Sequence, residues 1–594
     1  MSDYKAPLRD IQFVLYELLG YEAHCAKLPS GEESSPELVN AVLEEGAKFC
    51  EKVIAPLNAI GDEQGCKWVD GEVVTPVGFK AAYTQFVEAG WPSMCHSVEH
   101  GGQGLPESLG TVLNELTGTA NWSWSMYQGL SHGAMKTLEL HGTEEQKQAY
   151  LTKLVEGVWT GTMCLTEAHC GTDLGLLKTK AESLSDGSYS ITGSKIFISA
   201  GEHDLAENII HIVLARLPNA PAGTKGISLF VVPKYLPDSE GNIGERNQVS
   251  CGSLEHKMGI HGNATCVLNF DSAKGFLVGP PNRGLNCMFT FMNTARLGTA
   301  TQGLAHAELG YQKSLVYTRE RLQMRALSGA KNPDGPADPI IVHPDVRRML
   351  LTQKAFAEGG RMLIYYASQL VDIEQHTEGD QKSEAEDLLA LLTPIAKAFL
   401  TETGFESANL AMQCFGGHGY IREWGVEQNV RDARIAMLYE GTTGIQALDL
   451  LGRKVLMSEG ELLKRFTKII HKYCQANENN DVMAEFVQPL AELNKEWGEL
   501  TMHVGMAAMS DPEEVGAAAV DYLMYSGYIT LAYFWARAAE EALSITGSEE
   551  QAFYDSKVKT ARFYFERLLP RTRTLVVTIK SGAGNLMSLE EDEF

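Results

Sequence analysis

The stretch QCFGGHGYIREWGVEQNVRDARIAMLYEGTTG, residues 413–444, sets glycines and the carboxylate of Glu440 in an order that organises the rest of the sequence. Gly416 and Gly417 allow close approach of a ligand to the backbone, although tight helix–helix turns explain such glycines equally well. Glu440 lies between an aromatic residue and a glycine, just before a helix start predicted at Thr442. Most glutamates are solvated surface charges. The remaining sequence decides whether Glu440 acts on a ligand.

Length, charge and cysteine content bound the class of protein. The 594 residues suffice for about three to five domains. The formal net charge of −26 disfavours nucleic acid and anionic membranes as partners. The 11 cysteines form no CxxC pair, which favours a reducing compartment and gives no metal-site signal. The start MSDYKAPLRDIQF resembles neither a secretory signal nor a transit peptide, and no apolar run predicts a transmembrane helix. We therefore expect a cytoplasmic protein without stable membrane insertion.

Hydrophobic periodicity divides the chain into helical and strand-rich regions. Thr143, followed by Gln146, is a capping-box signal inside the first helical region. Short β-branched segments bounded by Gly, Pro, Asn or Asp predict strands, and long amphipathic patterns predict a helix bundle. In chain order the predicted regions are an N-terminal extension (1–33), a helical domain (34–160), a β-domain (161–283), a helical bundle (284–456) and an appended helical domain with an acidic tail (457–594).

The segment MCLTEAHCGTDLG, residues 163–175, lies where helix gives way to strand. Backbone N–H groups and a hydroxyl around Gly171, Thr172 and Asp173 suit an anion or the edge of a heterocycle. An Asp-containing turn with ordinary capping is the simpler interpretation of this stretch alone.

The segment ITGSKIFISAG, residues 191–201, places Phe197 and Ser199 two positions apart on a predicted strand, hence on one face. An aromatic ring beside a hydroxyl suits a flat ring system with a hydrogen-bond acceptor. Phe197 in an ordinary strand core is the alternative.

The segment YTRERLQMRA, residues 317–326, places Arg321 and Arg325 four apart, which predicts one helix face with two guanidinium groups. Arginine suits phosphate recognition. A solvated helix end is the commoner case.

The order of these motifs along one chain resembles the acyl-CoA dehydrogenase family of flavoenzymes over residues 34–456. The resemblance implies a mainly α fold with a β-barrel-like middle domain, a four-helix-bundle domain that carries the catalytic base, and bound FAD. The first 33 residues and the appended domain resemble a larger bacterial subgroup. The flavin contacts from a neighbouring subunit that the family uses imply a homo-oligomer, and we favour a dimer.

The resemblance assigns Glu440 as the base that removes the substrate α-proton. It assigns CoA or substrate contacts to Asn293, Arg296, Tyr439 and Gly441. The positions that match FAD contacts are Leu165, Thr166, Gly171, Thr172, Phe197, Ser199, Arg321, Gln323, Gln413, Gly416, Gly417, Thr442 and Gly444. Among these, Arg321, Gln413 and Gly417 match contacts to the FAD of a neighbouring subunit.

The sequence departs from the family pattern at several of these places. Cys170 and Leu176 stand where small residues are usual, and Gln323-Met324 replaces the usual Thr-Phe pair. Gly444 replaces a frequent glutamine, which removes a side-chain contact to flavin.

The reaction implied is α,β-dehydrogenation of a fatty acyl-CoA to the trans-2-enoyl-CoA, the first step of β-oxidation, with electrons passed to an electron-transfer flavoprotein. Burial against an acyl chain raises the pKa of a glutamate toward neutral pH and makes it a better base. In the family the backbone N–H of the base also stabilises enolate charge, here that of Glu440.

Three other functions stay open. A short 3-methylmercaptopropionyl-CoA-type substrate is the first alternative, and an acyl-CoA oxidase that uses the same base is the second. A nitroalkane oxidase relative would carry aspartate at position 440. A non-catalytic flavin-fold protein, including a DNA-associated one, is the third. Residues 453–594 carry 15 Lys/Arg and 22 Asp/Glu, a net charge of 15 − 22 = −7, which is the wrong sign for nucleic acid.

Overall fold

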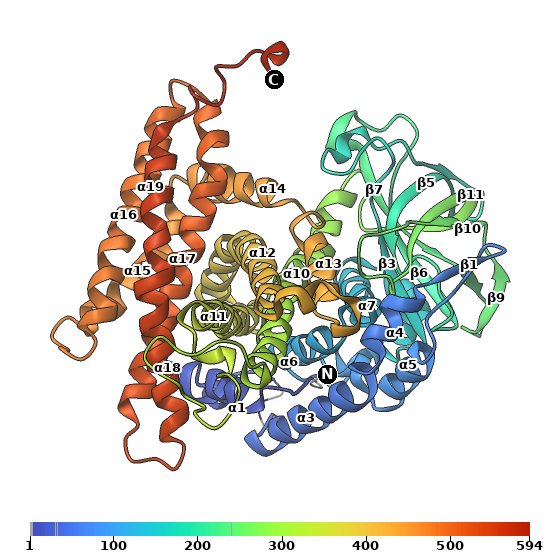
Figure 1. The fold of residues 1–594 in the computed structure, drawn as a ribbon. Helices are drawn as coiled ribbons and strands as arrows, with labels where there is room; N and C mark the ends of the chain where they lie inside the picture. The colour runs from blue at the N-terminus through green and yellow to red at the C-terminus, as the bar shows by residue number, and fades with distance from the viewer. Residues whose placement is uncertain (1–3, 30, 32–33, 239) are drawn as a thin grey trace. The chain divides into compact units, whose positions relative to one another are not determined.

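The computed structural model describes residues 4–29, 31, 34–238 and 240–594 (Figure 1). The chain forms two compact units, one of residues up to Asn40 together with Thr299–Phe594, and one of Ala41–Gly298. The second unit contains a helical part and the β-domain. The first contains the bundle, the appended domain and the N-terminal segment.

The helical part of the Ala41–Gly298 unit confirms the predicted periodicity. Its helices are α4 (Leu57–Gln64), α5 (Phe79–Glu88), α6 (Glu107–Ala120), α7 (Trp122–His141), α8 (Glu144–Gln146) and α9 (Thr152–Val155), after α3 (Pro36–Phe49). The predicted capping box is present, since the Thr143 hydroxyl accepts from Gln146 N at 3.3 Å and Gln146 Oε1 accepts from Thr143 N at 3.1 Å.

A β-hairpin interrupts this region, so the prediction of helix throughout it is wrong. β1 (Lys67–Val69) pairs antiparallel with β2 (Glu72–Val74) through a turn at Asp70-Gly71. Both turn residues have positive φ, 52° for Asp70 and 89° for Gly71. An Asp-Gly pair is a strong hairpin signal because it tolerates this backbone, and here it outweighs the flanking helical pattern.

The β-domain is a barrel-like sheet whose strands close a ring. β11 pairs with β5 and β7, β5 pairs with β4, and β4 and β7 both pair with β6. β10 extends the sheet beyond β11, and β3 runs parallel to β6 (Figure 1). The strands are β3 (Trp159–Cys164), β4 (Lys180–Ser183), β5 (Tyr189–Ser199), β6 (Asn208–Arg216), β7 (Ile227–Pro233), β10 (Val249–Leu254) and β11 (Thr265–Val278); β8 (Tyr235–Pro237) pairs separately with β9 (Ile243–Arg246). Ring closure removes the edges of the strands within the ring and buries their apolar faces, while β10 and β3 remain edge strands.

The bundle is built from three long helices, α10 (Gly284–Glu320), α11 (Pro344–His376) and α12 (Gly379–Phe415), followed by the short α13 (Glu427–Arg434) and α14 (Thr443–Leu448). α10 begins in the Ala41–Gly298 unit and ends in the other. The segment 379–420 contains an 18-residue window with a mean hydropathy of 1.3, which is apolar and long enough to span a bilayer by composition alone. Its most apolar window is 83% buried, as expected for a helix inside a bundle.

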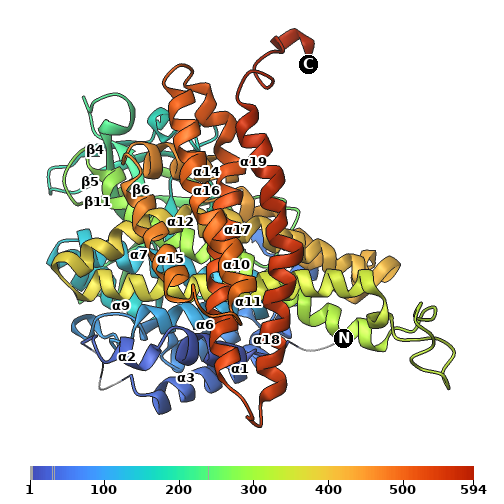
Figure 2. The same cartoon turned by 90° about the vertical axis from the view of Figure 1, so that its left-hand side faces the viewer.

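The appended domain consists of α15 (Glu461–Ala476), α16 (Ala484–Ala508), α17 (Glu513–Ser544), α18 (Gln551–Phe563) and α19 (Thr572–Ser581). Within its unit α17 packs against α16, α18 and α19, and also against α11 and α12 (Figure 2). A mainly helical chain with one sheet domain between helical regions of the sequence confirms the predicted fold class.

The N-terminal segment is ordered by a buried charge cluster. It forms α1 (Leu8–Gln12) and α2 (Tyr21–Cys25), and the Asp10 carboxylate ion-pairs with Arg361 of α11 and Lys557 of α18. Arg361 also reaches Glu308 at 2.9 Å, and Lys557 reaches Glu358 at 2.7 Å. The extension therefore ties the bundle to the appended domain, a role that the sequence did not reveal.

Candidate active site

The LTE loop, residues 165–167, follows β3 and is fixed by a buried lysine. Lys195 of β5 is fully buried, and its Nζ donates to Leu165 O and to Glu167 Oε1, each at 2.9 Å. Ile196 N donates to Thr166 O at 2.9 Å. The strand that carries Phe197 and Ser199 thus also sets the path of the loop that carries Leu165 and Thr166.

The Glu167 carboxylate organises the other side of the loop. It accepts from Thr179 Oγ1 at 2.6 Å and from the backbone N–H groups of Thr179 and Lys178. Burial alone would raise the pKa of Glu167, but the Lys195 ammonium and the Thr179 hydroxyl outweigh it and lower that pKa to about 2. The carboxylate is therefore ionised over the whole physiological range.

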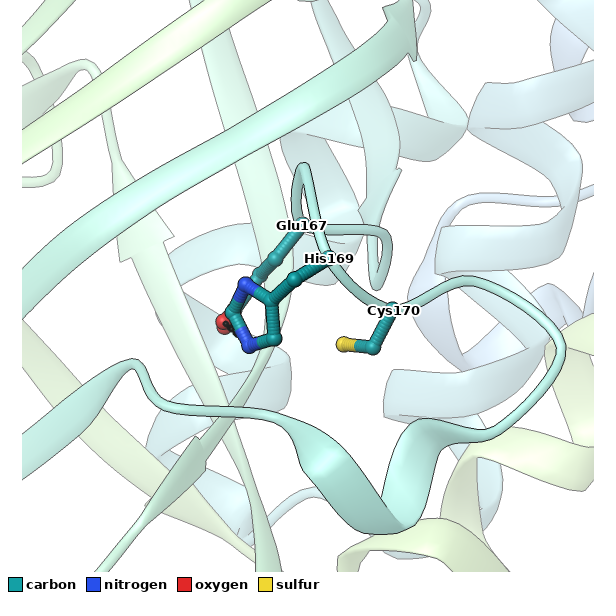
Figure 3. Close-up of side chains that lie close together, drawn as sticks. All are labelled: Glu167, His169 and Cys170. Carbon is teal, nitrogen blue, oxygen red and sulfur yellow. Dashed lines mark ion pairs between the residues drawn. The ribbon is translucent and has the colours of Figure 1, made fainter.

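Glu167, His169 and Cys170 lie together on this loop, with one ligand atom of each within 4.8 Å of the others (Figure 3). Such a trio has the donor types of a metal site. Here both carboxylate oxygens already accept hydrogen bonds, and the Lys195 ammonium lies 2.9 Å from one of them. His169 Nε2 lies 3.0 Å from Leu176 O. A cation would have to displace these donors and approach an ammonium, so the trio is better explained as a loop anchor.

The GTD turn after this loop is exposed at Gly171, Thr172 and Asp173. Asp173 Oδ1 accepts from Gly175 N at 3.0 Å, so this residue caps the short 3₁₀ turn that follows. The capping interpretation therefore holds for Asp173, while Thr172 and the backbone of Gly171 are open to a ligand.

Phe197 and Ser199 lie at the end of β5, where the register with β11 shifts. Phe197 has φ 60° and is 60% exposed, whereas Ile198 between the two residues is buried. The alternative of an ordinary core phenylalanine is therefore wrong. A strained backbone that presents an aromatic ring to the outside is typical of a ligand site.

Asn293 and Arg296 lie near the start of α10, one turn apart on the same helix. Arg296 Nη1 donates to Asn293 Oδ1 at 3.3 Å. Asn293 is exposed and Arg296 is half-buried, so both polar groups are positioned as a pair.

Arg321 and Arg325 do not share a helix face, because α10 ends at Glu320. Leu322 instead forms a β-bridge with Pro339, and Gln323 N donates to Asp338 O at 3.0 Å. Arg325 folds back onto Asp338 at 3.2 Å and is used within its own loop. Arg321 is exposed, and no residue in the described part of the chain pairs with its guanidinium. Only Arg321 is thus left to bind a ligand, and Gln323 is exposed beside it.

The glycine motif of residues 416–419 adjoins this helix end through stacked aromatic side chains. Tyr317, one turn before Arg321, stacks on Phe415 at 4.1 Å, and its hydroxyl lies 2.9 Å from His418 Nδ1. A Cβ on Gly416 or Gly417 would meet nothing within 4 Å, whereas one on Gly419 would lie 2.3 Å from Met412 O. Gly416 and Gly417 therefore leave an open surface, with Gln413 exposed beside them, while Gly419 serves packing.

Glu440 occupies a turn with left-handed backbone between α13 and α14. Its φ is 58° and that of Gly441 is 91°. The φ of Gly441 lies in a region that residues with a Cβ rarely adopt, and a Cβ there would also displace Gln446 Nε2, which would lie 2.5 Å away. Gln446 Nε2 in turn donates to Glu440 O at 3.0 Å. A non-glycine residue held in this region costs about 1–3 kcal/mol and persists only where its surroundings enforce it.

A buried lysine enforces this turn, and sequence reasoning missed it. Lys397 of α12 is fully buried, and its Nζ donates to Ala436 O at 2.9 Å and to Gly441 O at 2.6 Å. The two carbonyls bracket Glu440. A lysine inside the apolar run LLTPIAKAFL was the available signal, because a charge in a buried helix needs specific partners.

The flanking residues are also fixed. The Tyr439 hydroxyl donates to Gln302 Oε1 at 2.5 Å, and Thr442 caps α14 by accepting from Ile445 N at 3.3 Å. The helix start predicted here is therefore confirmed. Gly444 is open, since a Cβ would meet only Thr442 Oγ1 at 3.9 Å.

These placements fit FAD, the cofactor that the resemblance implies. Several of the residues assigned to it have accessible polar or aromatic groups, whereas Leu165 is buried and the Thr442 hydroxyl caps α14. Thr166 and Ser199 are half-buried, Gly417 is open at Cβ, and Arg321 has a free guanidinium among the described residues. Thr166, Ser199 and Phe197 would hold the ring system, and Arg321 would hold phosphate.

Four family models match successive parts of the chain. They are the acyl-CoA dehydrogenase N-terminal domain (37–158), middle domain (162–273) and C-terminal domain (282–456), and the acetyl-CoA dehydrogenase C-terminal-like domain (466–590).

Characterised relatives match over nearly the whole length. The chain is 42% identical to 3-methylmercaptopropionyl-CoA dehydrogenase of Ruegeria pomeroyi over 95% of this chain and 96% of the relative. It is 34% identical to a broad-specificity linear acyl-CoA dehydrogenase of Mycobacterium tuberculosis over 100% of both. It is 32% identical to a butyryl-CoA dehydrogenase of Syntrophomonas wolfei over 100% of this chain and 99% of the relative.

Solved structures share the fold. The Bacillus anthracis acyl-CoA dehydrogenase complexed with FAD gives a TM-score of 0.74 at 20% identity, covering 96% of this chain and 91% of that one. Caenorhabditis elegans ACDH-11 in complex with C11-CoA gives 0.76 at 20% identity, covering 95% and 92%. The chain therefore belongs to the acyl-CoA dehydrogenase family of FAD-dependent oxidoreductases.

Proposed function

We propose that this enzyme removes the α-proton of an acyl-CoA thioester with the Glu440 carboxylate and thereby forms the trans-2-enoyl-CoA. The turn around Glu440 is the observation that carries the proposal. Its backbone is left-handed, and the carbonyls of Ala436, Glu440 and Gly441 are each held by a side-chain donor. Hydrogen bonds to these three carbonyls fix the strained turn and hold the Glu440 carboxylate in one position, as a general base requires.

FAD and groups next to the Glu440 carboxylate supply the other functions that the reaction needs. FAD, when bound, supplies the acceptor for the hydride that leaves the β-carbon. The Glu440 N–H is a donor suited to the enolate charge that develops on the thioester oxygen. Tyr439, oriented by Gln302, flanks the reacting carbon. Burial under the acyl chain would raise the pKa of the glutamate and make it a stronger base.

We infer that the substrate is a short, unbranched acyl-CoA. Two of the relatives are named for butyryl-CoA and 3-methylmercaptopropionyl-CoA. Butyryl has four chain atoms, and 3-methylmercaptopropionyl has five once its sulfur is counted. The relative at 42% identity favours the thioether over longer fatty acyl chains as the physiological group. A linear fatty acyl-CoA of broad length range is the second candidate, supported by the relative from M. tuberculosis.

An electron-transfer flavoprotein is the proposed electron acceptor. A solved structure titled as an electron transferring flavoprotein of Acidaminococcus fermentans, in work on electron bifurcation, matches this chain at 27% identity with a TM-score of 0.57, covering 69% of this chain and 96% of that one. The oxidase alternative would instead consume dioxygen.

A homodimer is the proposed assembly. Large apolar side chains are exposed on the segments next to Arg321 and Gly417, with Leu327 98% exposed, Met324 76% and Tyr420 82%. Clustered exposed side chains of this size mark interaction surfaces. A second copy that covers them would bring its own flavin to Arg321, as the family resemblance implies. Light scattering that shows a monomer at micromolar concentration would overturn this assembly.

The test is anaerobic reduction of the yellow holoenzyme by a graded series of thioesters. Butyryl-, pentanoyl-, 3-methylmercaptopropionyl-, octanoyl- and palmitoyl-CoA are compared by the rate at which flavin absorbance bleaches. We expect the highest kcat/KM at four or five chain atoms and slow oxygen uptake without the electron-transfer flavoprotein. No bleaching by any of these thioesters would refute the dehydrogenase function, and a maximum at palmitoyl-CoA would refute the chain length.

A further inference from the structure

A pocket with a volume of about 370 Å³ lies beside the Glu440 turn, within one compact unit. Residues of α12, of the end of α13 with the turn after it, and of the start of α14 line it. They are Glu402, Phe405, Arg434, Met437, Leu438, Thr442, Thr443 and Gly444. Apolar side chains with a few converging polar groups are typical of a ligand site.

Arg434 is the cation of this pocket. Its Nη1 is buried and has no hydrogen-bond partner in the described part of the chain. Its guanidinium lies 5.9 Å from the ring centre of Phe405, a contact too long to replace a hydrogen bond. A charged donor without an acceptor is costly, and Arg434 lines the pocket, so its guanidinium is the group there that an anion would satisfy.

The carboxylate in the same pocket is already occupied. Glu402 Oε1 accepts from Thr443 Oγ1 at 2.6 Å, and Glu402 forms no ion pair with Arg434. The positive charge of Arg434 is therefore not neutralised locally. An arginine of this kind matches an anion with several oxygens, above all phosphate, because its planar fork donates two parallel hydrogen bonds.

Gly444 leaves room for that anion. A side chain at this position would fill part of the pocket, and the space around a Cβ here is open except for Thr442 Oγ1 at 3.9 Å. Position 444 is also where the sequence lacks the glutamine frequent in the family. Gly444, which lacks the glutamine donor, and Arg434, whose Nη1 has no hydrogen-bond partner in the described part of the chain, thus line the same pocket.

We propose that Arg434 binds a phosphate group of a nucleotide ligand of this active site and replaces the donor that Gly444 lacks. The proposal rests on the proposed function, because FAD and acyl-CoA are the ligands that bring phosphate there. The pyrophosphate of FAD is the first source, since Thr442 and Gly444 match flavin contacts. The phosphates of CoA are the second source.

Two binding measurements on Arg434→Met and Arg434→Lys distinguish these sources. Apoprotein is titrated with FAD by quenching of flavin fluorescence, and holoenzyme is titrated with CoA by the shift of its flavin spectrum. Loss of one charge-assisted contact predicts Kd about 10- to 100-fold weaker for Met, with a smaller loss for Lys. Weaker FAD binding assigns the contact to the cofactor, and weaker CoA binding with FAD retained assigns it to the substrate.

The matched control is Arg453→Met. Its side chain is 69% exposed and pairs with Asp449 at 3.4 Å, outside the pocket. We expect Kd values for FAD and CoA within twofold of wild type. Binding of both ligands to Arg434→Met with wild-type Kd, in a protein with wild-type circular dichroism, would overturn the inference. Failure of acyl-CoA to bleach the wild-type flavin would instead refute the proposed function, so the two failures are separate.

Discussion

Replacement of Lys397 by methionine removes the ammonium that brackets the proposed base while keeping the length of the side chain. Two hydrogen bonds, to Ala436 O at 2.9 Å and Gly441 O at 2.6 Å, are lost inside the protein. A hydrogen bond to a charged group contributes about 1.5–3 kcal/mol, so the pair contributes about 3–6 kcal/mol if the turn cannot relax. This exceeds the roughly 1–3 kcal/mol of strain expected for Glu440 at φ 58°.

Without that clamp we expect the turn to relax and the productive position of Glu440 to become a minor state. If about 1.4–2.8 kcal/mol of the lost energy appears in the barrier, the rate of flavin reduction falls about 10- to 100-fold. The KM for butyryl-CoA should change less than threefold, because Lys397 contacts the backbone of the turn. The assay is anaerobic stopped-flow bleaching, normalised to bound flavin.

Lys557→Met is the matched control for Lys397→Met. Lys557 is also buried, and its replacement also removes ion pairs, here with Asp10 and Glu358, but Lys557 lies on α18 in the appended domain. It should lower the melting temperature and leave the bleaching rate per flavin within twofold of wild type. Lys397→Arg should recover part of the rate, since it keeps the charge. Wild-type bleaching by Lys397→Met would refute the clamp.

Three further predictions follow from other parts of the structure. Arg321→Ala should lose FAD on dilution, with flavin content measured by absorbance, whereas Arg325→Ala, whose guanidinium is paired with Asp338, should retain it; equal retention would contradict the phosphate role. Asp10→Asn should lower the free energy of unfolding by about 3–5 kcal/mol at pH 7, because it removes the carboxylate charge that the buried Lys557 and Arg361 share and leaves each with one carboxylate partner, Glu358 and Glu308; denaturant unfolding with a change below 1 kcal/mol would contradict this. The pKa of Glu167, at about 2, lies below its unfolded value, so the stability contributed by its carboxylate is complete above pH of about 5 and is lost as the pH falls toward 2. The free energy of unfolding of Glu167→Gln, followed by circular dichroism, should therefore fall less over this pH range than that of wild type.

The strands of the β-domain and the helices of the bundle could be predicted because local patterns and tertiary packing agree there. β7 is buried over its whole length and β6 over all but its last residue, and the Thr143 capping box needs only residues three apart. The hairpin at Asp70-Gly71 was missed because two short strands lie inside a helical pattern. Its turn was nevertheless the strongest local signal of that region.

Part of the candidate site could also be predicted from the sequence, and part could not. The turn around Glu440 and the LTE loop carry recognisable motifs, so their positions could be found. The residues that hold them, Lys397 and Lys195, come from distant elements, and their role depends on which carbonyls the fold brings to them. The helix face predicted for Arg321 and Arg325 failed for a related reason. The loop after Glu320 gains a bridge from Leu322 to Pro339 that ends the helix, and this bridge depends on residues distant in sequence.

The central claim is that Glu440 is the base. Glu440→Gln keeps the size of the side chain and its backbone N–H but removes the charge. The decisive measurement is anaerobic bleaching of this variant by the best thioester of the series, with FAD content confirmed by its spectrum. The account predicts full FAD content, acyl-CoA binding within about tenfold of wild type and a bleaching rate lower by at least about 10³-fold. Bleaching at the wild-type rate would contradict it.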